Sequence, residues 1–274
     1  MAKKIPFENE LILHKLTQKH LRKLFNLKCI ASEIQINKLR LDNLAFDENK
    51  NSFVIIEYKN RFNAKVLNQA QEYYDLVLKK QESFLERLEN LNNTNFENRR
   101  VMIISPKFSD KQISEAKPNF ELWQVSLYDD CHVEYKNLRT NETETLTSLT
   151  KDDLKLTEDD LLKNKTAKIC ELYNTLKNRV QTEFSDIKCK ILVDEISFKI
   201  NNKIICNIKF LKKSFNVYFF AEEINDEKNN LRDISDISTG GKAKYELKIN
   251  SKNDLNYFID LFKQVYSQKR DIDV

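Results

Sequence analysis

The sequence predicts an α/β domain with a mixed sheet flanked by helices, followed by a smaller α+β domain. In the first half of the chain, helical and strand patterns alternate, which favours an α/β domain. Residues 141–165 are polar, rich in Thr, Asp, Glu and Lys, and show no strong apolar period, which is typical of a linker. The expected organisation is therefore a first domain at 1–140, a linker at 141–165 and a second domain at 166–274.

The elements of the first domain follow from apolar spacing. Apolar residues three and four positions apart predict a helix over 8–26, and a strand over 29–36 and a hairpin over 38–59 come next. A long helix is expected over 68–91. The remaining elements are a buried strand at 100–105, a short helix at 110–116, and strands at 121–126 and 131–135.

The second domain is predicted from the same signals. They indicate a helix at 166–180, strands at 195–200, 203–210, 215–221 and 245–249, and a closing helix at 253–267. Asn201 and Asn202 predict a tight turn between the first two of these strands. Residues 222–241 show no regular pattern and are expected to be irregular.

Composition excludes several classes of function. The chain has 274 residues, of which 41% are hydrophobic, and its two glycines are adjacent, Gly240 and Gly241. A Walker loop or a dinucleotide-binding fingerprint needs spaced glycines, so an ATPase or a Rossmann dehydrogenase is excluded. The five cysteines are scattered without C-x-x-C spacing, which argues against a disulfide framework or a zinc site.

The sequence contains no membrane or export signal. No apolar run approaches the ~20 residues that span a bilayer. The first residues, Met1-Ala2-Lys3-Lys4-Ile5-Pro6, lack the apolar core of a signal peptide. We therefore expect a cytoplasmic protein with no membrane partner.

The predicted hairpin over 38–59 carries charges where a buried strand should carry none. Its second strand is strongly apolar until the charges begin at Glu57 and Lys59, and polar residues at 47–51 supply the turn. Side chains alternate between the faces of a strand, so Glu57 and Lys59 share one face. This pattern is typical of a buried strand that opens into a cleft at its end.

The register of the hairpin indicates a metal site. If Phe46 faces Phe53, the antiparallel register places Asp42 opposite Glu57. Like charges directly across a ladder are unfavourable, and a divalent cation between them reverses the sign of that interaction. The alternative is that Asp42 ends a hairpin in water and that Glu57 and Lys59 form a surface ion pair worth roughly 0–1 kcal/mol.

Basic residues are concentrated in the first helix and the strand after it. Between Leu11 and Ser32 the chain has five basic residues and no acidic one: Lys15, Lys19, Arg22, Lys23 and Lys28. The net charge of the whole chain is only +4. Such a run is compatible with a surface that faces a polyanion, and the alternative is an ordinary solvated helix face.

Several segments, in this order, resemble the PD-(D/E)XK nuclease superfamily. They are Ala31-Ser32-Glu33, Arg40-Leu41-Asp42-Asn43-Leu44, Val54-Ile55-Ile56-Glu57-Tyr58-Lys59 and Asn68-Gln69-Ala70-Gln71-Glu72-Tyr73-Tyr74. The likeness is to the branch of RecB-like nucleases and mismatch-specific endonucleases, and it covers roughly residues 8–136. It implies a restriction-endonuclease-like mixed sheet and a metal-dependent nuclease.

The resemblance also implies roles for individual residues. Asp42, Glu57 and the carbonyl of Tyr58 would hold Mg²⁺, with Mn²⁺ as the alternative ion, and Lys59 would orient the attacking water or stabilise charge. Glu10 resembles the additional acid of this superfamily, and Gln69 would position the substrate or the water. Tyr73 has the same expected role, with a buried core tyrosine as the alternative. Candidate phosphate contacts are Lys19, Lys23 and Arg61.

The expected partner is nucleic acid, with DNA favoured over RNA by the resemblance alone. An enzyme of this kind that cuts both strands often acts as a homodimer, so a homodimer is a further expectation. A role in defence or repair fits the same family. The competing hypothesis is a catalytically silent nucleic-acid-binding or assembly protein that keeps the fold.

The second domain resembles a domain of unknown function often found behind such nuclease domains. The similar residues are Arg232-Asp233-Ile234-Ser235 and Asn253-Asp254-Leu255. The glycine-rich segment usual in that domain is reduced here to Ser238-Thr239-Gly240-Gly241. A third hypothesis would place an activity in this half, but Glu195, Asp233 and Asp236 are more simply interpreted as solvated or capping residues.

Overall fold

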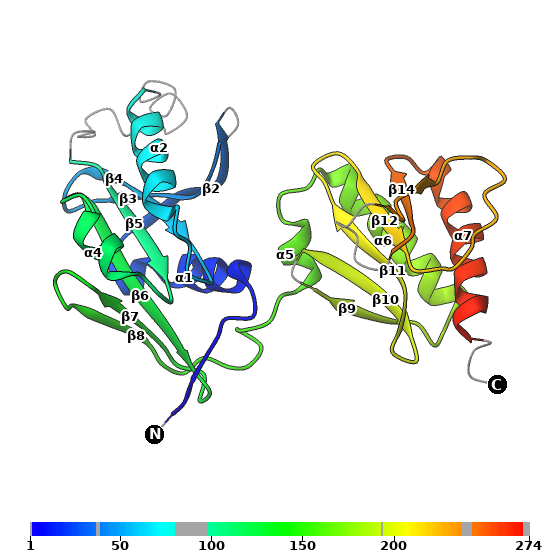
Figure 1. Ribbon diagram of the computed structural model, residues 1–274, viewed down its shortest axis with the longest axis horizontal. Helices are drawn as coiled ribbons and strands as arrows, with labels where there is room; N and C mark the ends of the chain where they lie inside the picture. Colours follow the sequence, from blue (N-terminus) through cyan, green and yellow to red (C-terminus); the bar gives the residue numbers. More distant parts are fainter. Residues whose placement is uncertain (1, 37–38, 80–97, 193, 237–242, 271–274) are drawn as a thin grey trace. The chain divides into compact units, whose positions relative to one another are not determined.

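The computed structural model describes residues 2–36, 39–79, 98–192, 194–236 and 243–270 (Figure 1). The chain divides into two compact units, Met1–Lys155 and Leu156–Val274, and each is described here by itself. The first unit is a mixed α/β structure with a large sheet flanked by helices, as the sequence predicts. In the part of the chain that is described, no helix combines the length and the apolar character needed to cross a membrane.

Among the described residues, the sheet of the first unit contains eight strands. They are β1 (Lys4–Ile5), β2 (Lys28–Ile36), β3 (Leu39–Asp47), β4 (Ser52–Tyr58), β5 (Arg100–Ser105), β6 (Phe120–Tyr128), β7 (Val133–Asn137) and β8 (Thr143–Leu146). Their order is β2-β3-β4-β5-β6-β7-β8, with β1 paired to β6. The central strands β4, β5 and β6 are parallel, and the other neighbours are antiparallel.

Two helices cover opposite faces of this sheet. Helix α2 (Val66–Lys79) packs with buried β4 residues such as Phe53 and Ile55. Helix α1 (Glu10–Phe25) contacts the other face, where His14 stacks on Tyr58 with ring centroids 4.8 Å apart. A short helix, α4 (Asp110–Glu115), lies between β5 and β6 in the chain. The alternation of side chains along β4 therefore gives each helix its own apolar surface.

The hairpin of β3 and β4 has the predicted register, with Phe46 opposite Phe53. Their rings meet edge to face, 5.6 Å apart. The turn begins at Asp47, whose Oδ1 accepts hydrogen bonds from the backbone N–H groups of Asn49 and Lys50, each at 3.0 Å. Every residue of β4 is buried.

The prediction of a linker at 141–165 is wrong for part of this segment. Residues Thr143–Leu146 form β8, which pairs with β7 and extends the sheet, and Leu146 is buried. A helix, α5 (Glu158–Leu162), occupies a later part. A four-residue strand with one buried apolar side chain gives almost no periodic signal, which explains why this strand was not predicted.

The expected long helix over 68–91 is described only in part. Helix α2 begins at Val66 and is described to Lys79, and residues 80–91 lie outside the described residues. The same holds for Ser238-Thr239-Gly240-Gly241 of the second half.

In its described part, the second unit is an antiparallel six-stranded sheet with helices. In chain order its elements are α5, α6 (Ala167–Glu183), β9 (Lys188–Ile191), β10 (Glu195–Ile200), β11 (Lys203–Phe210), β12 (Phe215–Phe219), β13 (Arg232–Asp233), β14 (Tyr245–Ile249) and α7 (Asn253–Arg270). The strand order is β13-β14-β12-β11-β10-β9. The tight turn between β10 and β11 is confirmed, because Asn201 and Asn202 have φ angles of 44° and 66°.

Candidate active site

Asp42 and Glu57 lie on the neighbouring strands β3 and β4, at the same end of the hairpin. The antiparallel pairing extends to Asn43 opposite Ile56, and Asp42 and Glu57 are the next opposed positions. The backbone N–H of Tyr58 donates to Asp42 Oδ2 at 3.0 Å, which fixes this carboxylate beside β4. Glu57 is only 1% exposed. The structure thus brings together the two carboxylates that the sequence pattern singled out.

The ammonium group of Lys59 lies against the same carboxylates. Lys59 Nζ donates to Glu57 Oε1 at 2.6 Å and to the carbonyl oxygen of Tyr58 at 2.8 Å. It is 3.7 Å from Glu10 Oε1. The backbone N–H of Lys59 donates to the carbonyl of Ile104 on β5 at 2.9 Å, so the main chain at this end of β4 is held by the neighbouring strand.

The two carboxylates are destabilised by their surroundings. Burial, followed by repulsion from Asp42, raises the pKa of Glu57 to about 8. Burial also raises the pKa of Asp42, although the Tyr58 N–H and the charge of Lys59 act in the opposite direction. Burial lowers the pKa of Lys59, but the adjacent Glu57 outweighs this effect and the net pKa is raised. Closely spaced acids with raised pKa values are typical of functional sites.

Glu10 reaches the site from the N-terminus of α1. Asn9 caps this helix by accepting a hydrogen bond from the N–H of Leu11 at 2.8 Å, so the helix begins at Glu10. Glu10 Oε2 accepts from the backbone N–H of Asn60 at 3.3 Å, and its side chain is 42% exposed. Glu10 therefore contacts both Lys59 and the backbone of the residue that follows it.

The oxygen atoms of the site fit a hard divalent cation. Glu57 Oε2 is buried and accepts no hydrogen bond from the residues that the structure describes. Asp42 and the Tyr58 carbonyl offer further oxygens, and Mg²⁺ prefers such ligands while it keeps several waters. The described residues include no group of three or more His, Cys, Asp or Glu side chains placed to hold a metal.

Gln69 and Tyr73 lie one turn apart on α2 and are connected to β3. Gln69 Nε2 donates to the Tyr73 hydroxyl at 2.7 Å, and that hydroxyl donates to the carbonyl of Arg40 at 2.7 Å. Tyr73 is 3% exposed and belongs to the core beneath α2. These bonds connect α2 to β3 two residues before Asp42, and the burial of Tyr73 agrees with the alternative of a core tyrosine.

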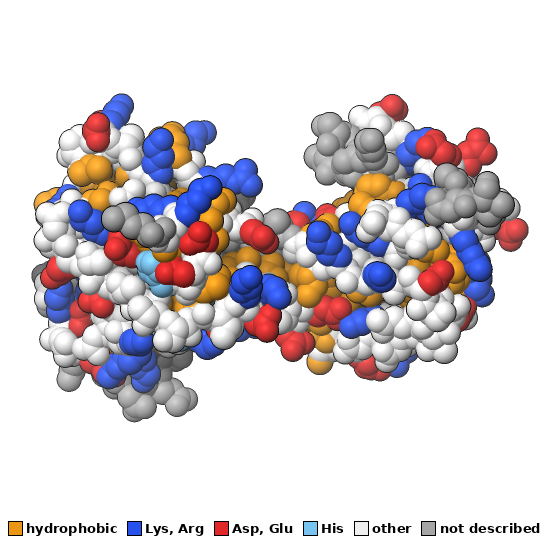
Figure 2. Space-filling view, turned by 90° about the horizontal axis from the view of Figure 1, so that it is seen from below, with side chains coloured by type: hydrophobic (Ala, Val, Ile, Leu, Met, Phe, Trp, Pro, Cys, Tyr) orange, Lys and Arg blue, Asp and Glu red, His pale blue; other side chains and the backbone are white. Residues whose placement is uncertain are grey.

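The three candidate phosphate contacts differ in their surroundings. Lys19 forms an ion pair with Asp153 at 2.9 Å. Lys23 and Arg61 are exposed, and neither side chain makes an ion pair with a described residue. On the face shown in Figure 2, Lys and Arg side chains are interspersed with Asp and Glu side chains. The basic run in the sequence is therefore partly neutralised by residues distant in the chain.

Two residues beside the carboxylates were not predicted from the sequence to belong to the site. Asn43 is fully buried, and its Oδ1 accepts a hydrogen bond from the Tyr58 hydroxyl at 2.8 Å. His14 stacks on the Tyr58 ring from α1. Both had a signal: Asn43 is an amide inside an apolar strand, and His14 lies one helical turn after Glu10 on the same face.

Glu195 and Asp233 of the second unit form local hydrogen bonds. Glu195 accepts a hydrogen bond from Asn207 at 2.8 Å, and Asp233 accepts from the backbone N–H of Ser235 at 2.8 Å. Asp236 is exposed. These contacts agree with the simpler interpretation of capping and solvated side chains.

The chain is similar to a bacterial protein over most of its length and to a solved structure over part of it. No family model matches it. It is 29% identical over 283 residues to an uncharacterized protein of Haemophilus influenzae, covering 94% of this chain and 93% of that protein. A solved EndoMS–dsDNA2 complex is similar with a TM-score of 0.31 and 15% identity, over 44% of this chain and 47% of that chain. A similarity of that size shows neither an activity nor a substrate of this chain.

Proposed function

We propose that this chain is a Mg²⁺-dependent nuclease that hydrolyses phosphodiester bonds of DNA, in defence or repair. One observation carries the proposal: Asp42, Glu57 and Lys59 converge at one end of a buried hairpin, where two carboxylates face each other at the cost of raised pKa values. A purely structural ion pair needs one carboxylate. A second buried carboxylate beside it is destabilising unless a cation or a reaction makes use of it.

Asp42, Glu57 and the Tyr58 carbonyl are the groups that would hold the ion. When bound, Mg²⁺ or Mn²⁺ supplies positive charge that polarises a phosphodiester and lowers the pKa of a coordinated water. The buried Glu57 oxygen without a hydrogen bond is the acceptor that favours this assignment. Asp42 keeps its orientation through the Tyr58 N–H.

Lys59 supplies the fixed positive charge of the proposed site. Its ammonium group remains protonated because Glu57 raises its pKa. A donor aimed at the charge that develops on a phosphate stabilises the transition state more than the ground state. Glu10 and Asn60 hold the entry to the loop after Lys59, and Gln69 and Tyr73 hold β3, so these groups position the reacting residues.

The first test is cleavage of single-stranded, duplex and branched DNA, and of matched RNA, with Mg²⁺ or Mn²⁺. We expect metal-dependent cutting by the wild type. Lys59→Ala should lower the rate by about 10²-fold or more, because it removes a charge that acts on the transition state, and Asp42→Asn should lower it at least as much. Lys111→Ala, which removes an exposed lysine of α4, is the matched control and should cut normally.

The competing function is nucleic-acid binding without catalysis. Two contacts of one side chain favour it: the Lys59 ammonium already contacts Glu57 and the Tyr58 carbonyl, which neutralises part of the site within the chain itself. DNA binding without cleavage in the presence of either metal ion would support this alternative and contradict the proposal of a nuclease. Sedimentation of the wild type with and without duplex DNA tests the expected homodimer.

A further inference from the structure

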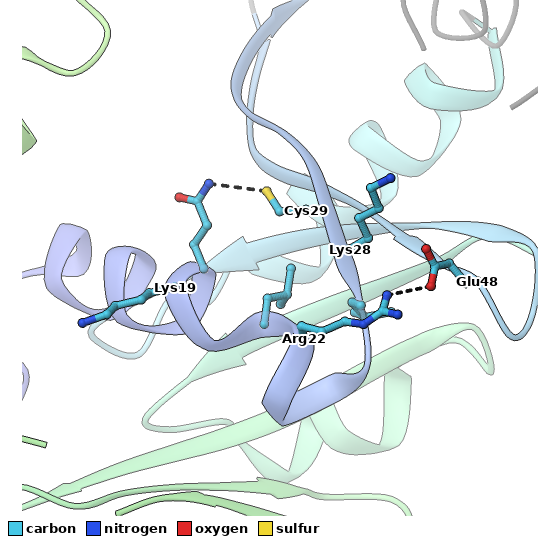
Figure 3. Close-up of a pocket in the computed structure, with 8 residues that line it drawn as sticks. Lys19, Arg22, Lys28, Cys29 and Glu48 are labelled. Carbon is cyan, nitrogen blue, oxygen red and sulfur yellow. Dashed lines mark hydrogen bonds and ion pairs between the residues drawn. The ribbon is translucent and has the colours of Figure 1, made fainter. Parts of the chain in front are cut away.

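A polar pocket lies at the far end of α1 from the carboxylates (Figure 3). Its volume is about 420 Å³, which is within the range of small-ligand sites. The lining comes from α1, the start of β2 and the turn of the β3–β4 hairpin, and it consists of Gln18, Lys19, Leu21, Arg22, Leu27, Lys28, Cys29 and Glu48. Three of these side chains are cationic and one is anionic, so the pocket favours an anion.

The cationic side chains of the pocket can exchange their present partners for an anion at a small cost in free energy. Arg22 pairs with Glu48 at 2.7 Å, as Figure 3 shows, and the two side chains are 59% and 46% exposed. Lys19 pairs with Asp153 and is also 59% exposed. Exposed pairs of this kind are worth about 0–1 kcal/mol, so a phosphate can replace the carboxylates. Lys28 makes no ion pair with any residue that the structure describes.

Helix α1 connects the pocket to the carboxylate site. Glu10 is the first residue of the helix and contacts Lys59, and Arg22 lies twelve residues later in the last turn. At 1.5 Å per residue these positions are about 18 Å apart along the helix axis. This length corresponds to roughly five nucleotides at 3.4 Å per nucleotide of one strand. The pocket is therefore at a distance that a short stretch of nucleic acid can bridge.

Helix geometry alone offers a different explanation for two cations. Arg22 and Lys23 lie in the last turn of α1, where positive charge compensates the helix dipole. Lys28 does not share this explanation, because it belongs to β2. Glu48 lies in the hairpin turn and opposes an anion whatever the helix does. These two residues therefore separate phosphate binding from helix stabilisation.

We propose that this pocket binds backbone phosphates of the nucleic-acid strand, about five nucleotides from the bond held at Asp42, Glu57 and Lys59. The inference rests on the proposed function, which it deepens by adding a second anchor for the same strand. Phosphate contacts of this kind set register and affinity without reading sequence. The pocket therefore predicts a minimum length of substrate rather than a sequence preference.

The test is binding without cleavage, measured by fluorescence anisotropy on a labelled 20-nucleotide single strand and a 20-base-pair duplex. The full chain carries Asp42→Asn as background, and Mg²⁺ is absent. We expect Lys28→Gln to weaken binding three- to tenfold near 0.1 M salt and to lower the salt slope by about 0.7–0.9, the value of one lost phosphate contact. Glu48→Gln should strengthen binding two- to threefold.

Lys111→Gln removes the same charge from α4 and should change affinity by less than twofold. The proposal would be overturned if Lys28→Gln and Lys111→Gln changed the affinity equally and Glu48→Gln gave no gain. It would also be overturned if the chain showed no DNA binding in this assay. Cleavage by the wild type is scored separately. Cutting without the Lys28 and Glu48 effects on binding would support the nuclease and reject the pocket as a phosphate site. Those effects on binding without any cutting would support the pocket and reject the nuclease.

Discussion

Lys59 occupies the position of a counter-ion in this site. Its ammonium group contacts the Glu57 carboxylate and the Tyr58 carbonyl. Asp42 and Glu10 are two further acidic groups around it. Three acidic groups therefore surround the Lys59 ammonium group, and Arg40 is a further cation that acts on Asp42. Burial raises the pKa values of Asp42 and Glu57, so ionising both of them is a local cost to stability.

Asp42→Asn should separate the stability of the site from its function. The amide oxygen of Asn can still accept the Tyr58 N–H, while the buried charge of Asp42, which burial disfavours, disappears. We expect the metal-free variant to unfold about 2–4 °C higher than the wild type, which corresponds to about 1 kcal/mol. Added Mg²⁺ should raise the unfolding temperature of the wild type and not of the variant, as measured by circular dichroism in EDTA and in Mg²⁺.

Asp110→Asn is the control for that prediction, because it neutralises an exposed carboxylate in the first turn of α4. Its unfolding temperature should stay within about 1 °C of the wild type, since a favourable helix-dipole contact is worth only a few tenths of a kcal/mol at an exposed position. A metal-free Asp42→Asn variant less stable than the wild type would contradict the view that the carboxylates repel each other.

At the scale of elements, the β3–β4 hairpin sets the geometry of the site. Asp47 starts its turn, accepts two backbone hydrogen bonds, and pairs with Arg100 of β5 at 2.8 Å. The hairpin is thereby attached to the parallel part of the sheet. An error in this turn would shift the register, which would place Asp42 and Glu57 on opposite faces.

Asp47→Asn should show a pH-dependent loss of stability. Burial raises the pKa of Asp47, but the Lys50 N–H and Arg100 outweigh it, and the net pKa is below the ordinary 3.8. An acid whose pKa is lower in the folded state than in the unfolded state stabilises the fold at pH values above its pKa in the unfolded state. This contribution is lost as the pH falls through its pKa in the folded state. In urea titrations we expect the variant to be about 1–2 kcal/mol less stable at pH 6, with the difference shrinking below pH 4.

Glu48→Gln is the matched control for Asp47→Asn, because Glu48 is the next residue and is exposed. Its stability should differ from the wild type by less than about 0.5 kcal/mol at either pH. A stability difference for Asp47→Asn that grew as the pH fell would rule out the proposed role of this carboxylate.

The hairpin also shows why part of the molecule could be predicted from its sequence. Alternation along β4 and the polar turn fixed the pairing of Phe46 with Phe53, and the positions of Asp42 and Glu57 followed from counting. Contacts between distant segments gave no such signal. Nothing local to Lys19 indicates that Asp153 neutralises it, and nothing local to Tyr73 indicates that its hydroxyl bonds the carbonyl of Arg40.

At the scale of the whole molecule, the boundary of the first unit decides what an isolated fragment retains. The division falls after Lys155, whereas composition placed the end of the first domain at residue 140. The fifteen residues between these points contain β8, which pairs with β7, and the Asp153 carboxylate that pairs with Lys19. Leu146 of β8 is 1% exposed.

A fragment of residues 1–155 should therefore unfold cooperatively in urea, and a fragment of residues 1–140 should be less stable by at least about 2 kcal/mol or fail to fold. Loss of β8 uncovers an edge of the sheet and removes the burial of Leu146, and truncation of a buried Leu alone costs about 2–5 kcal/mol. Leu146→Ala in the full chain should reproduce a large part of that loss. Leu211→Ala, at a leucine that is 40% exposed, should cost less than about 0.5 kcal/mol. Equal urea midpoints for the two fragments would mean that β8 contributes no stability and that the sheet of the site is complete at residue 140.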